Sequence, residues 1–284
     1  MTAAVVAGGV GAGGRRALRQ VVKAAAAASD AVRRPAGGVV ALLYHRVGTG
    51  SGLELDLPAP VFERQVATLA ARHRVLGYDG AVDAVSGPPP PGGGDAVTVT
   101  FDDGTADFVD VALPVLVRHR VPAVLFLATA FVEESRPFPG DGTPLSWAAL
   151  ADALTTGLVT IGSHTHGHRL LDRLPPAQVA AELDRSVGLV EDRLGVTPRH
   201  FAYPKAVPGG AAAAAEVRRR FRSAALAGTR ANRYGATDPY RLARSPVQAS
   251  DGMRWFARKV GGGMELEDRL RGVANRRRYA GRTA

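Results

Sequence analysis

Two adjacent carboxylates form the first group in the sequence that suggests chemistry. Asp102 and Asp103 directly follow the apolar, β-branched residues 96–101 (AVTVTF) and precede Gly104. Two neighbouring acids at the end of a buried strand are unfavourable unless something neutralises them. Successive residues at a strand end point in different directions, so one carboxylate can hold a metal ion while the other serves as a base. The simpler interpretation is that one of them caps a following helix.

Three of the seven histidines lie within one stretch of five residues. His164, His166 and His168 form the string HTHGH after a short apolar run. His164 and His168 are four residues apart, which would place both on one face of a helical turn, as in two-histidine metal sites. His164 and His166 are the alternative pair, because they would share a face in an extended strand. Either pair, with one aspartate, leaves room around a metal for water and substrate.

The absence of cysteine narrows the choice of metal ligands. The 284 residues include no cysteine, which excludes disulfides, thiolate catalysis and cysteine-bound zinc or iron–sulfur centres. A metal must therefore be bound by His, Asp or Glu, and these ligands favour a hard or borderline divalent ion. Such an ion acidifies a bound water and polarises a carbonyl group. The residues therefore predict a hydrolytic metal site.

Alternating strands and helices surround these residues. We expect strands at Val39–Tyr44 and at residues 96–101, 123–128, 158–162, 200–203 and 224–227, and helices at residues 60–74, 107–119, 147–154, 176–194 and 211–221. This alternation predicts an α/β architecture with mainly parallel strands. Right-handed crossovers would gather the carboxyl ends of the strands on one face, where barrels of this class carry their active sites.

The two ends of the chain differ from this body. Residues 1–37 are low in complexity, and we interpret them as a flexible or loosely helical leader before a domain at residues 38–250. Residues 251–284 are predicted to form an exposed C-terminal helix and a basic tail. We expect no transmembrane segment. The apolar run after Arg15 and Arg16 is too short and alanine-based for a convincing signal peptide, which slightly favours a cytoplasmic location over export or the cell surface.

The chain is strongly basic, with a net charge of +10. Only three of its 36 cationic residues are lysines, and we attribute the arginine excess to coding composition. Attraction to a polyanion is the other interpretation. No helix-turn-helix, RNP or finger pattern accompanies the charge, so we expect no nucleic-acid partner.

Four strings together resemble a known family. TFDDG at residues 100–104 and HTHGH at residues 164–168 are similar to the first two motifs of the polysaccharide deacetylase family, also called carbohydrate esterase family four or the NodB-homology domain. FAYP at residues 201–204 partly matches the third motif, and LYHRV at residues 43–47 resembles a leader strand of some members. The resemblance covers about residues 96–250. It implies a distorted (β/α) barrel and removal of N- or O-acetyl groups from sugars.

The same resemblance implies roles for individual residues. Asp102 would be the general base, and Asp103, His164 and His168 would hold one divalent metal ion, usually zinc. The backbone N–H of Tyr203 would help to stabilise the oxyanion. His166 receives no role from the family pattern.

Two departures from the family pattern leave two roles without an assigned residue. The arginine that steadies the base is replaced in the third motif by Ala202, and Arg241 or Arg244 could supply a substitute guanidinium. The final Leu-x-His motif, which supplies the general acid, is missing because no histidine follows His200. We propose His45, which follows the buried run VVALLY, as the proton donor or as a substrate-orienting group. A structural histidine bonded within its own loop is the alternative.

These observations lead to one main hypothesis and two alternatives. The main hypothesis is a metal-dependent deacetylase that acts on an N- or O-acetylated polysaccharide or glycan intermediate. The first alternative is a metal-dependent hydrolase of a small cyclic amide on the same scaffold. The second is a catalytically weak, carbohydrate-binding relative. The sequence predicts neither the sugar nor the oligomeric state.

Overall fold

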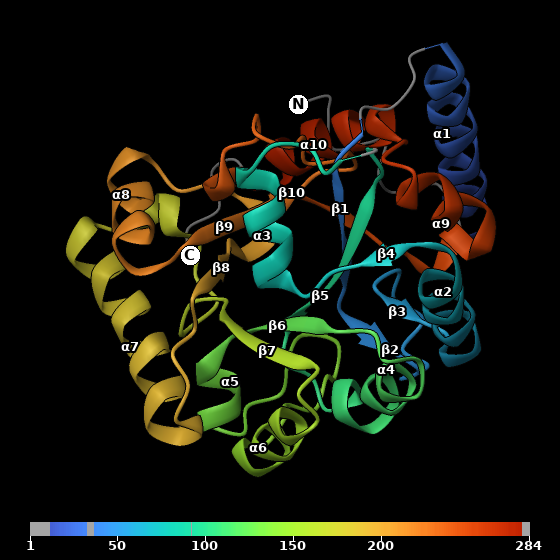
Figure 1. Cartoon of the computed structure of the whole chain (residues 1–284). Helices are drawn as coiled ribbons and strands as arrows, with labels where there is room; N and C mark the ends of the chain where they lie inside the picture. The colour runs from blue at the N-terminus through green and yellow to red at the C-terminus, as the bar shows by residue number, and fades with distance from the viewer. Residues whose placement is uncertain (1–11, 33–36, 92, 280–284) are drawn as a thin grey trace, which may run out of the picture.

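Parallel strands close into a barrel in the computed structural model, which describes residues 12–32, 37–91 and 93–279 (Figure 1). One sheet of eight strands runs in the order β1-β10-β9-β8-β7-β6-β5-β4, and a further pairing of β1 with β5 closes it. The strands of this sheet are β1 (Val39–Tyr44), β4 (Arg74–Val75), β5 (Ala96–Asp103), β6 (Ala123–Leu127), β7 (Val159–Ser163), β8 (His200–Ala202), β9 (Ser223–Ala227) and β10 (Leu242–Pro246).

The closure depends on the length of β5. One edge of β5 pairs with β1 along six residues, from Ala96 to Phe101. The other edge pairs first with the short β4 and then with β6. β4 therefore lies outside the closed ring. A separate ribbon of β2 (Arg46–Val47) and β3 (Asp56–Leu57) follows β1.

Helices surround the barrel and continue beyond it at both ends of the chain (Figure 1). The helices are α1 (Ala12–Val32), α2 (Ala59–Arg72), α3 (Tyr78–Ser86), α4 (Leu113–His119), α5 (Thr129–Glu133), α6 (Trp147–Thr155), α7 (Pro176–Leu194), α8 (Ala211–Arg220), α9 (Gly252–Val260) and α10 (Glu265–Tyr279). The longer of them bury one side each: α7, for example, buries Val179, Leu183 and Val190. This spacing is that of an amphipathic helix packed on a sheet.

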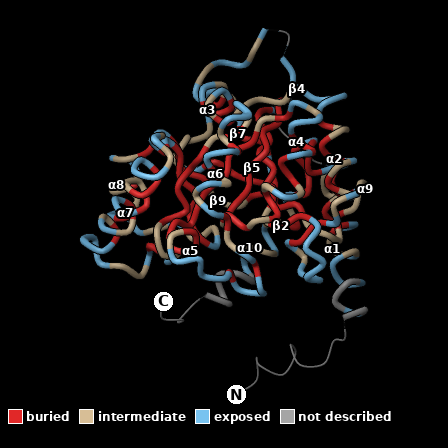
Figure 2. The backbone as a smooth tube through the Cα atoms, turned by 90° about the horizontal axis from the view of Figure 1, so that it is seen from below, coloured by how far each residue is buried: buried red, intermediate tan, exposed pale blue. Residues whose placement is uncertain are grey.

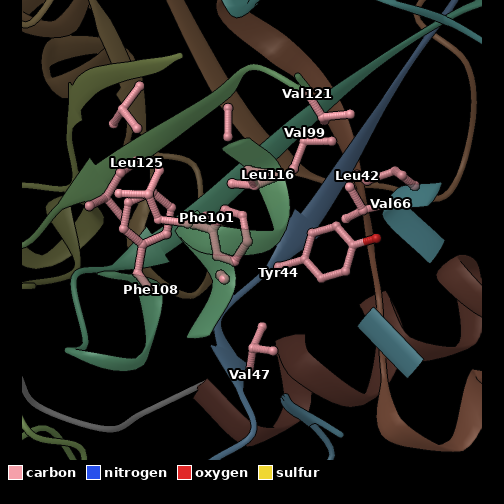
Figure 3. Close-up of a cluster of buried hydrophobic side chains, with 14 of the residues drawn as sticks. Leu42, Tyr44, Val47, Val66, Val99, Phe101, Phe108, Leu116, Val121 and Leu125 are labelled. Carbon is pink, nitrogen blue, oxygen red and sulfur yellow. The ribbon is translucent and has the colours of Figure 1, made fainter. Parts of the chain in front are cut away.

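The period-two alternation of β5 separates a core from the barrel interior. Val97, Val99 and Phe101 point outward into a large hydrophobic cluster under α2 and α4, part of which is shown in Figure 3. Figure 2 shows the buried backbone concentrated in the centre of the molecule. Successive side chains of a strand point to opposite faces. The residues of β5 that alternate with Val97, Val99 and Phe101, such as Thr100 and Asp102, therefore face the barrel interior.

Aromatic rings pack inside the barrel, where the Phe126 ring lies 4.9 Å from the guanidinium carbon of Arg244. Tyr78 at the start of α3 lies edge-on to Phe126 of β6 at 5.4 Å and to His200 of β8 at 4.9 Å. His200 also bonds to Ser223 and Asp79. His200 is the first residue of β8, so it lies away from the carboxyl end of that strand.

The predicted α/β barrel is confirmed, and the differences concern particular elements. β10 and the helices α3, α5 and α9 were not expected. The helix expected over residues 107–119 is divided: a π-helical turn at Phe108–Ala112 precedes α4. Pro114 has no N–H to donate and lies just after this turn, so it interrupts the helical hydrogen-bond ladder where the π-helical turn passes into α4.

Within the segment expected to be a flexible leader, residues 12–32 form the packed helix α1. Its Lys23 is buried and pairs with Asp251 and with Glu267 of α10. Residues 1–11 and 33–36 of that segment lie outside the described residues. The C-terminal region holds two helices where one exposed helix was expected, and α9 buries Trp255 and Phe256. The end of the predicted basic tail, residues 280–284, is also outside the description.

Among the residues described, none of the helices has both the length and the apolar character that crossing a bilayer requires.

Candidate metal and catalytic site

The carboxyl end of β5 presents both aspartates to one space. Asp102 faces the barrel interior and is 4% exposed. Asp103 has a φ of 77°, a left-handed conformation that ends the strand, and its carboxylate shares a cavity with that of Asp102. Gly104 follows with a φ of 105°, and a Cβ there would overlap the Leu127 side chain. A glycine is therefore required at the turn that brings the two carboxylates together.

The loop after β7 supplies His164 and His168 without forming a helix. The prediction that these two residues share one face of a helical turn is wrong, because this segment is irregular. Thr165 and His168 instead have φ values of 66° and 57°, so two left-handed residues turn the chain back toward the cavity. The Nδ1 atom of His164 lies 2.7 Å from the Ala202 carbonyl oxygen. Donation of that Nδ1–H leaves Nε2 as the lone-pair nitrogen.

Three side chains converge as a possible ligand set. The Oδ1 atom of Asp103 is 3.7 Å from Nε2 of His164 and 3.4 Å from Nε2 of His168. Ligand atoms about 2.0–2.1 Å from a tetrahedral zinc ion lie roughly 3.3–3.5 Å from each other. The separations observed without an ion are close to that spacing. Asp103, His164 and His168 also form the one group of acidic or histidine side chains among the described residues whose ligand atoms all lie within 4.8 Å.

The protonation states also suit metal binding. Burial lowers the pKa of His168 to about 3, so its ring is neutral at neutral pH. Burial alone would raise the pKa of Asp103, but the charges around it, with the His168 contribution largest, hold that pKa well below its usual value. Neutral imidazoles and an ionised carboxylate are the forms that bind a divalent ion.

His166 does not belong to this group. Its Nδ1 atom lies 3.0 Å from the Thr129 hydroxyl, and the residue is partly exposed. Of the two histidine pairs that the sequence left open, the structure therefore brings together His164 and His168.

Arg244 of β10 occupies the position that the missing motif arginine left open. Its Nη1 and Nη2 atoms lie 2.5 and 2.8 Å from Oδ1 and Oδ2 of Asp102. Burial alone would raise the pKa of Asp102, but the Arg244 guanidinium outweighs it and lowers the pKa. Asp102 is therefore ionised and fixed in orientation. Arg241, the other candidate, is exposed.

His45 lies on the same cavity as the two aspartates. It follows β1, whose carboxyl end is next to that of β5. Its Nδ1 atom is buried and has no hydrogen-bond partner among the described residues. Burial lowers the pKa of His45 even though the charges of Asp103 and Asp102 act in the opposite direction. A ring whose buried Nδ1 atom lacks a partner does not fit the alternative of a histidine bonded within its own loop.

Tyr203 does not meet the expectation of an oxyanion donor. Its backbone N–H donates to the Ala225 carbonyl oxygen at 3.0 Å, as part of the pairing between β8 and β9. Its ring packs edge-on against Phe201 in a separate hydrophobic cluster. The neighbouring residues of this loop that do line the cavity are Lys205 and Ala206.

The cavity at the carboxyl ends of the strands has a volume of about 570 Å³. Besides the residues above, its wall includes four charged side chains of which the sequence analysis assigned none: Arg46, Glu54, Lys205 and Arg271. Arg46 lies within the string LYHRV, which gave it no role, whereas Glu54 and Arg271 belong to the segment before β3 and to α10, outside the expected motifs. Only the tertiary fold brings them to the site.

Comparison with known proteins agrees with this architecture. A family model described as polysaccharide deacetylase matches residues 90–220. IcaB from Ammonifex degensii has a similar solved structure, with a TM-score of 0.69 and 25% identity over 80% of this chain and 98% of that chain. The deacetylase PplD of Streptococcus pyogenes shares the fold, with a TM-score of 0.68 and 19% identity over 80% of this chain and 99% of that one.

A curated relative matches over a shorter stretch. The uncharacterized protein YlxY of Bacillus subtilis is 26% identical over 98 residues, which cover 34% of this chain and 27% of YlxY. This chain therefore matches only about a quarter of that relative's length. The family match at residues 90–220 contains both aspartates and the HTHGH string, whereas His45 and Arg244 lie outside it. The motifs, the barrel and the family match together identify residues 90–220 as a domain of the polysaccharide deacetylase family.

Proposed function

We propose that this protein is a metal-dependent hydrolase that removes acetyl groups from an N- or O-acetylated polysaccharide or glycan intermediate. The observation that carries the proposal is the convergence of Asp103, His164 and His168 beside a separate, ionised carboxylate, Asp102. One divalent ion, zinc by its preference for these ligands, would be held by the three converging side chains. When bound, it supplies Lewis-acid polarisation of the acetyl carbonyl and an acidified water.

Asp102 is the base in this proposal. Its Oδ2 atom lies 3.8 Å from Nε2 of His164, on the side of the ligand group. Asp102 itself is left free of the ligand set, so it can take a proton from the attacking water. Arg244 keeps both oxygens of the carboxylate in a fixed plane and keeps the group ionised.

His45 is the group that we propose to protonate the leaving atom. Amide cleavage expels a poor leaving group, so the nitrogen must receive a proton as the tetrahedral intermediate collapses. The described cavity wall contains three histidines: His45, His164 and His168. The latter two are assigned to the metal, which leaves His45 for proton donation or for orienting the sugar.

Acetate release tests the proposal. The zinc-loaded protein is incubated with a panel of N- and O-acetylated oligosaccharides and with small cyclic amides, and acetate and ring-opened products are measured. We expect acetate from at least one glycan. Ring opening without acetate release would instead favour the cyclic amide hydrolase. Glycan binding without either product would favour the carbohydrate-binding relative.

Asp102→Asn is the matched control for this assay. It removes the base but leaves the three proposed ligands in place. We expect it to retain zinc and to release acetate at least about 100-fold more slowly, the usual contribution of a positioned acid–base group. Near-normal turnover by this variant would remove Asp102 from the mechanism.

A further inference from the structure

The cavity wall carries more positive than negative side chains. Two carboxylates already have cationic partners: Asp102 pairs with Arg244, and Glu54 pairs with Arg19 of α1. Asp103 belongs to the proposed ligand set. The wall also holds three further cations, Arg46, Lys205 and Arg271, of which only Arg271 has a carboxylate partner within the described ranges, Asp268. With a divalent ion present as well, the cavity has an excess of positive charge that attracts anions.

Arg46 has a structural role that accounts for its presence. Its Nη1 and Nη2 atoms donate to the carbonyl oxygens of Gly140 and Pro139 at 2.6 and 2.7 Å. These contacts hold the loop that follows α5 against the β2–β3 ribbon. Lys205 makes no comparable contact among the described residues. Arg271 pairs with Asp268 of its own helix through Nη2, but its Nη1 atom has no partner in the described part of the chain.

Lys205 and Arg271 lie in one sector of the cavity rim. Lys205 follows β8, and Arg271 of α10 approaches the loop after β9, where its Nη2 atom lies 3.2 Å from the Thr229 hydroxyl. Strands β9, β8 and β7 are neighbours in the barrel, and His164 and His168 follow β7. Lys205 therefore follows the strand next to the one that precedes the proposed ligands, and Arg271 is one strand further along the same cavity wall. Glu54, by contrast, is in the segment that follows β1.

Both cations retain hydrogen-bonding capacity. The Nη1 atom of Arg271 is buried and has no hydrogen-bond partner in the described part of the chain, although Nη2 contacts Asp268 and Thr229. Lys205 forms no ion pair with any described residue, and its charge contributes to lowering the pKa of His45 and of His168. A buried donor left unpaired is unfavourable. An acceptor atom of a bound ligand would pair with this Arg271 donor.

A buried ion cluster fixes the helix that carries Arg271. Glu267, one turn earlier on α10, lies 3.0 Å from Lys23 of α1 and 3.7 Å from Lys259 of α9. Lys259 in turn contacts Asp251 at 2.8 Å. These four side chains are all nine-tenths buried or more. α10 is thus anchored to two other helices, which holds Arg271 at the cavity.

From this arrangement, and on the basis of the proposed deacetylase function, we propose that the substrate is an acidic glycan. An anionic substituent near the acetylated sugar, a carboxylate or a phosphate, binds between Lys205 and Arg271 while the acetyl group lies at the metal ligands. The guanidinium supplies directed donors, and the ammonium supplies a mobile point charge. Arg271 and Lys205 are therefore specificity-determining residues of this site.

Matched oligosaccharides test the preference. Three substrates share the same acetylated sugar, and its neighbour is neutral, carboxylated or phosphorylated. We expect kcat/KM to be about tenfold or more higher for at least one charged substrate, since charge-assisted hydrogen bonds contribute about 1.5–3 kcal/mol. The advantage should shrink as salt is raised. Whether the carboxylate or the phosphate is preferred identifies the anion. Equal or lower kcat/KM for both charged substrates would overturn the proposal.

Variants assign the preference to the two cations. Arg271→Gln and Lys205→Gln should each reduce the ratio of charged to neutral kcat/KM by about tenfold, and Arg271→Lys should restore part of it. Arg118→Gln is the control, because Arg118 pairs with Glu63 on the exposed surface and should leave the ratio unchanged. A ratio that neither Gln variant alters would contradict the assignment. Circular dichroism verifies that each variant is folded.

Binding separates this inference from the proposed function. Calorimetry with the Asp102→Asn protein measures the affinity for the same three oligosaccharides without turnover. Tighter binding of a charged oligosaccharide, with no acetate released from any substrate by the wild type, would support the anion site and contradict the deacetylase function. Acetate release with no charge preference in rate or affinity would support the deacetylase function and contradict the anion site.

Discussion

Arg244 and Asp102 form a buried, two-contact ion pair between strands that are far apart in the sequence. The guanidinium comes from β10 and the carboxylate from β5, with N···O distances of 2.5 and 2.8 Å. β1 lies between these strands in the barrel and pairs with both. The pair therefore spans the interior beside β1, and it ties the proposed base to a strand outside the family match. The proposed role of Asp102 as a base therefore depends on the whole closed barrel.

Removal of Arg244 should affect both stability and rate. Arg244→Gln leaves Asp102 buried without its partner, so we expect the free energy of unfolding to fall by about 3–5 kcal/mol and kcat to fall at least about tenfold. Denaturant unfolding and acetate release measure the two effects. In the double variant with Asp102→Asn, the loss of stability should be smaller than the sum of the single losses. Additive losses would show that the two residues do not interact.

His45→Gln tests the proposed proton donor. A general acid must be protonated to act, so its loss of a proton at rising pH produces the alkaline limb of the rate profile. We expect the variant to lose that limb, to turn over more slowly and to keep its metal. His73→Gln is the matched control, since His73 is exposed at the end of α2. An alkaline limb unchanged in His45→Gln would exclude His45 as the acid.

His200 predicts a stability change with pH that is remote from the site. Burial lowers the pKa of His200 below the unfolded value of about 6.5, although Asp79 acts in the opposite direction. As the pH falls below about 6.5, the unfolded chain therefore binds a proton that the folded chain does not. Folding stability is full above this pH and decreases as the pH falls toward the folded pKa, by at most about 1.4 kcal/mol per pH unit.

Thermal or denaturant unfolding between pH 7 and pH 5 measures this effect. His200→Gln cannot titrate, so its stability should depend less steeply on pH than that of the wild type, whatever its absolute stability. Identical slopes for the two proteins would mean that His200 does not contribute the expected proton linkage.

The parts of the fold that the sequence predicted are those with a strong local pattern. The β-branched run AVTVTF and the amphipathic segment 176–194 specify their structures from their own residues. β10 has the sequence LARSP. Its interior residue Arg244 and terminal Pro246 interrupt the apolar pattern that predicts a buried strand. Its strand character depends on pairing with β1 and β9. The buried position of Arg244 inside the barrel is understood only from its partner, Asp102.

The candidate site likewise contains residues that the sequence predicted and residues that it did not. The family resemblance implied the three converging side chains together, but the spacing argument for the histidine pair was structurally wrong. The four-residue spacing of His164 and His168 suggested a helix, whereas left-handed backbone at Thr165 and His168 brings the rings together. The Tyr203 assignment failed because strand pairing uses its N–H. Arg271 could not be predicted, because its position depends on how α10 packs against α1 and α9.

Metal content and acetate release of two histidine variants test the central claim most directly. His168→Ala removes a proposed ligand, whereas His166→Ala removes a histidine two residues away that bonds to Thr129. Elemental analysis of both purified proteins after zinc loading, together with the acetate assay, gives the comparison. The account predicts that His168→Ala loses stoichiometric metal and activity together, and that His166→Ala keeps both. Full metal retention by His168→Ala would contradict it.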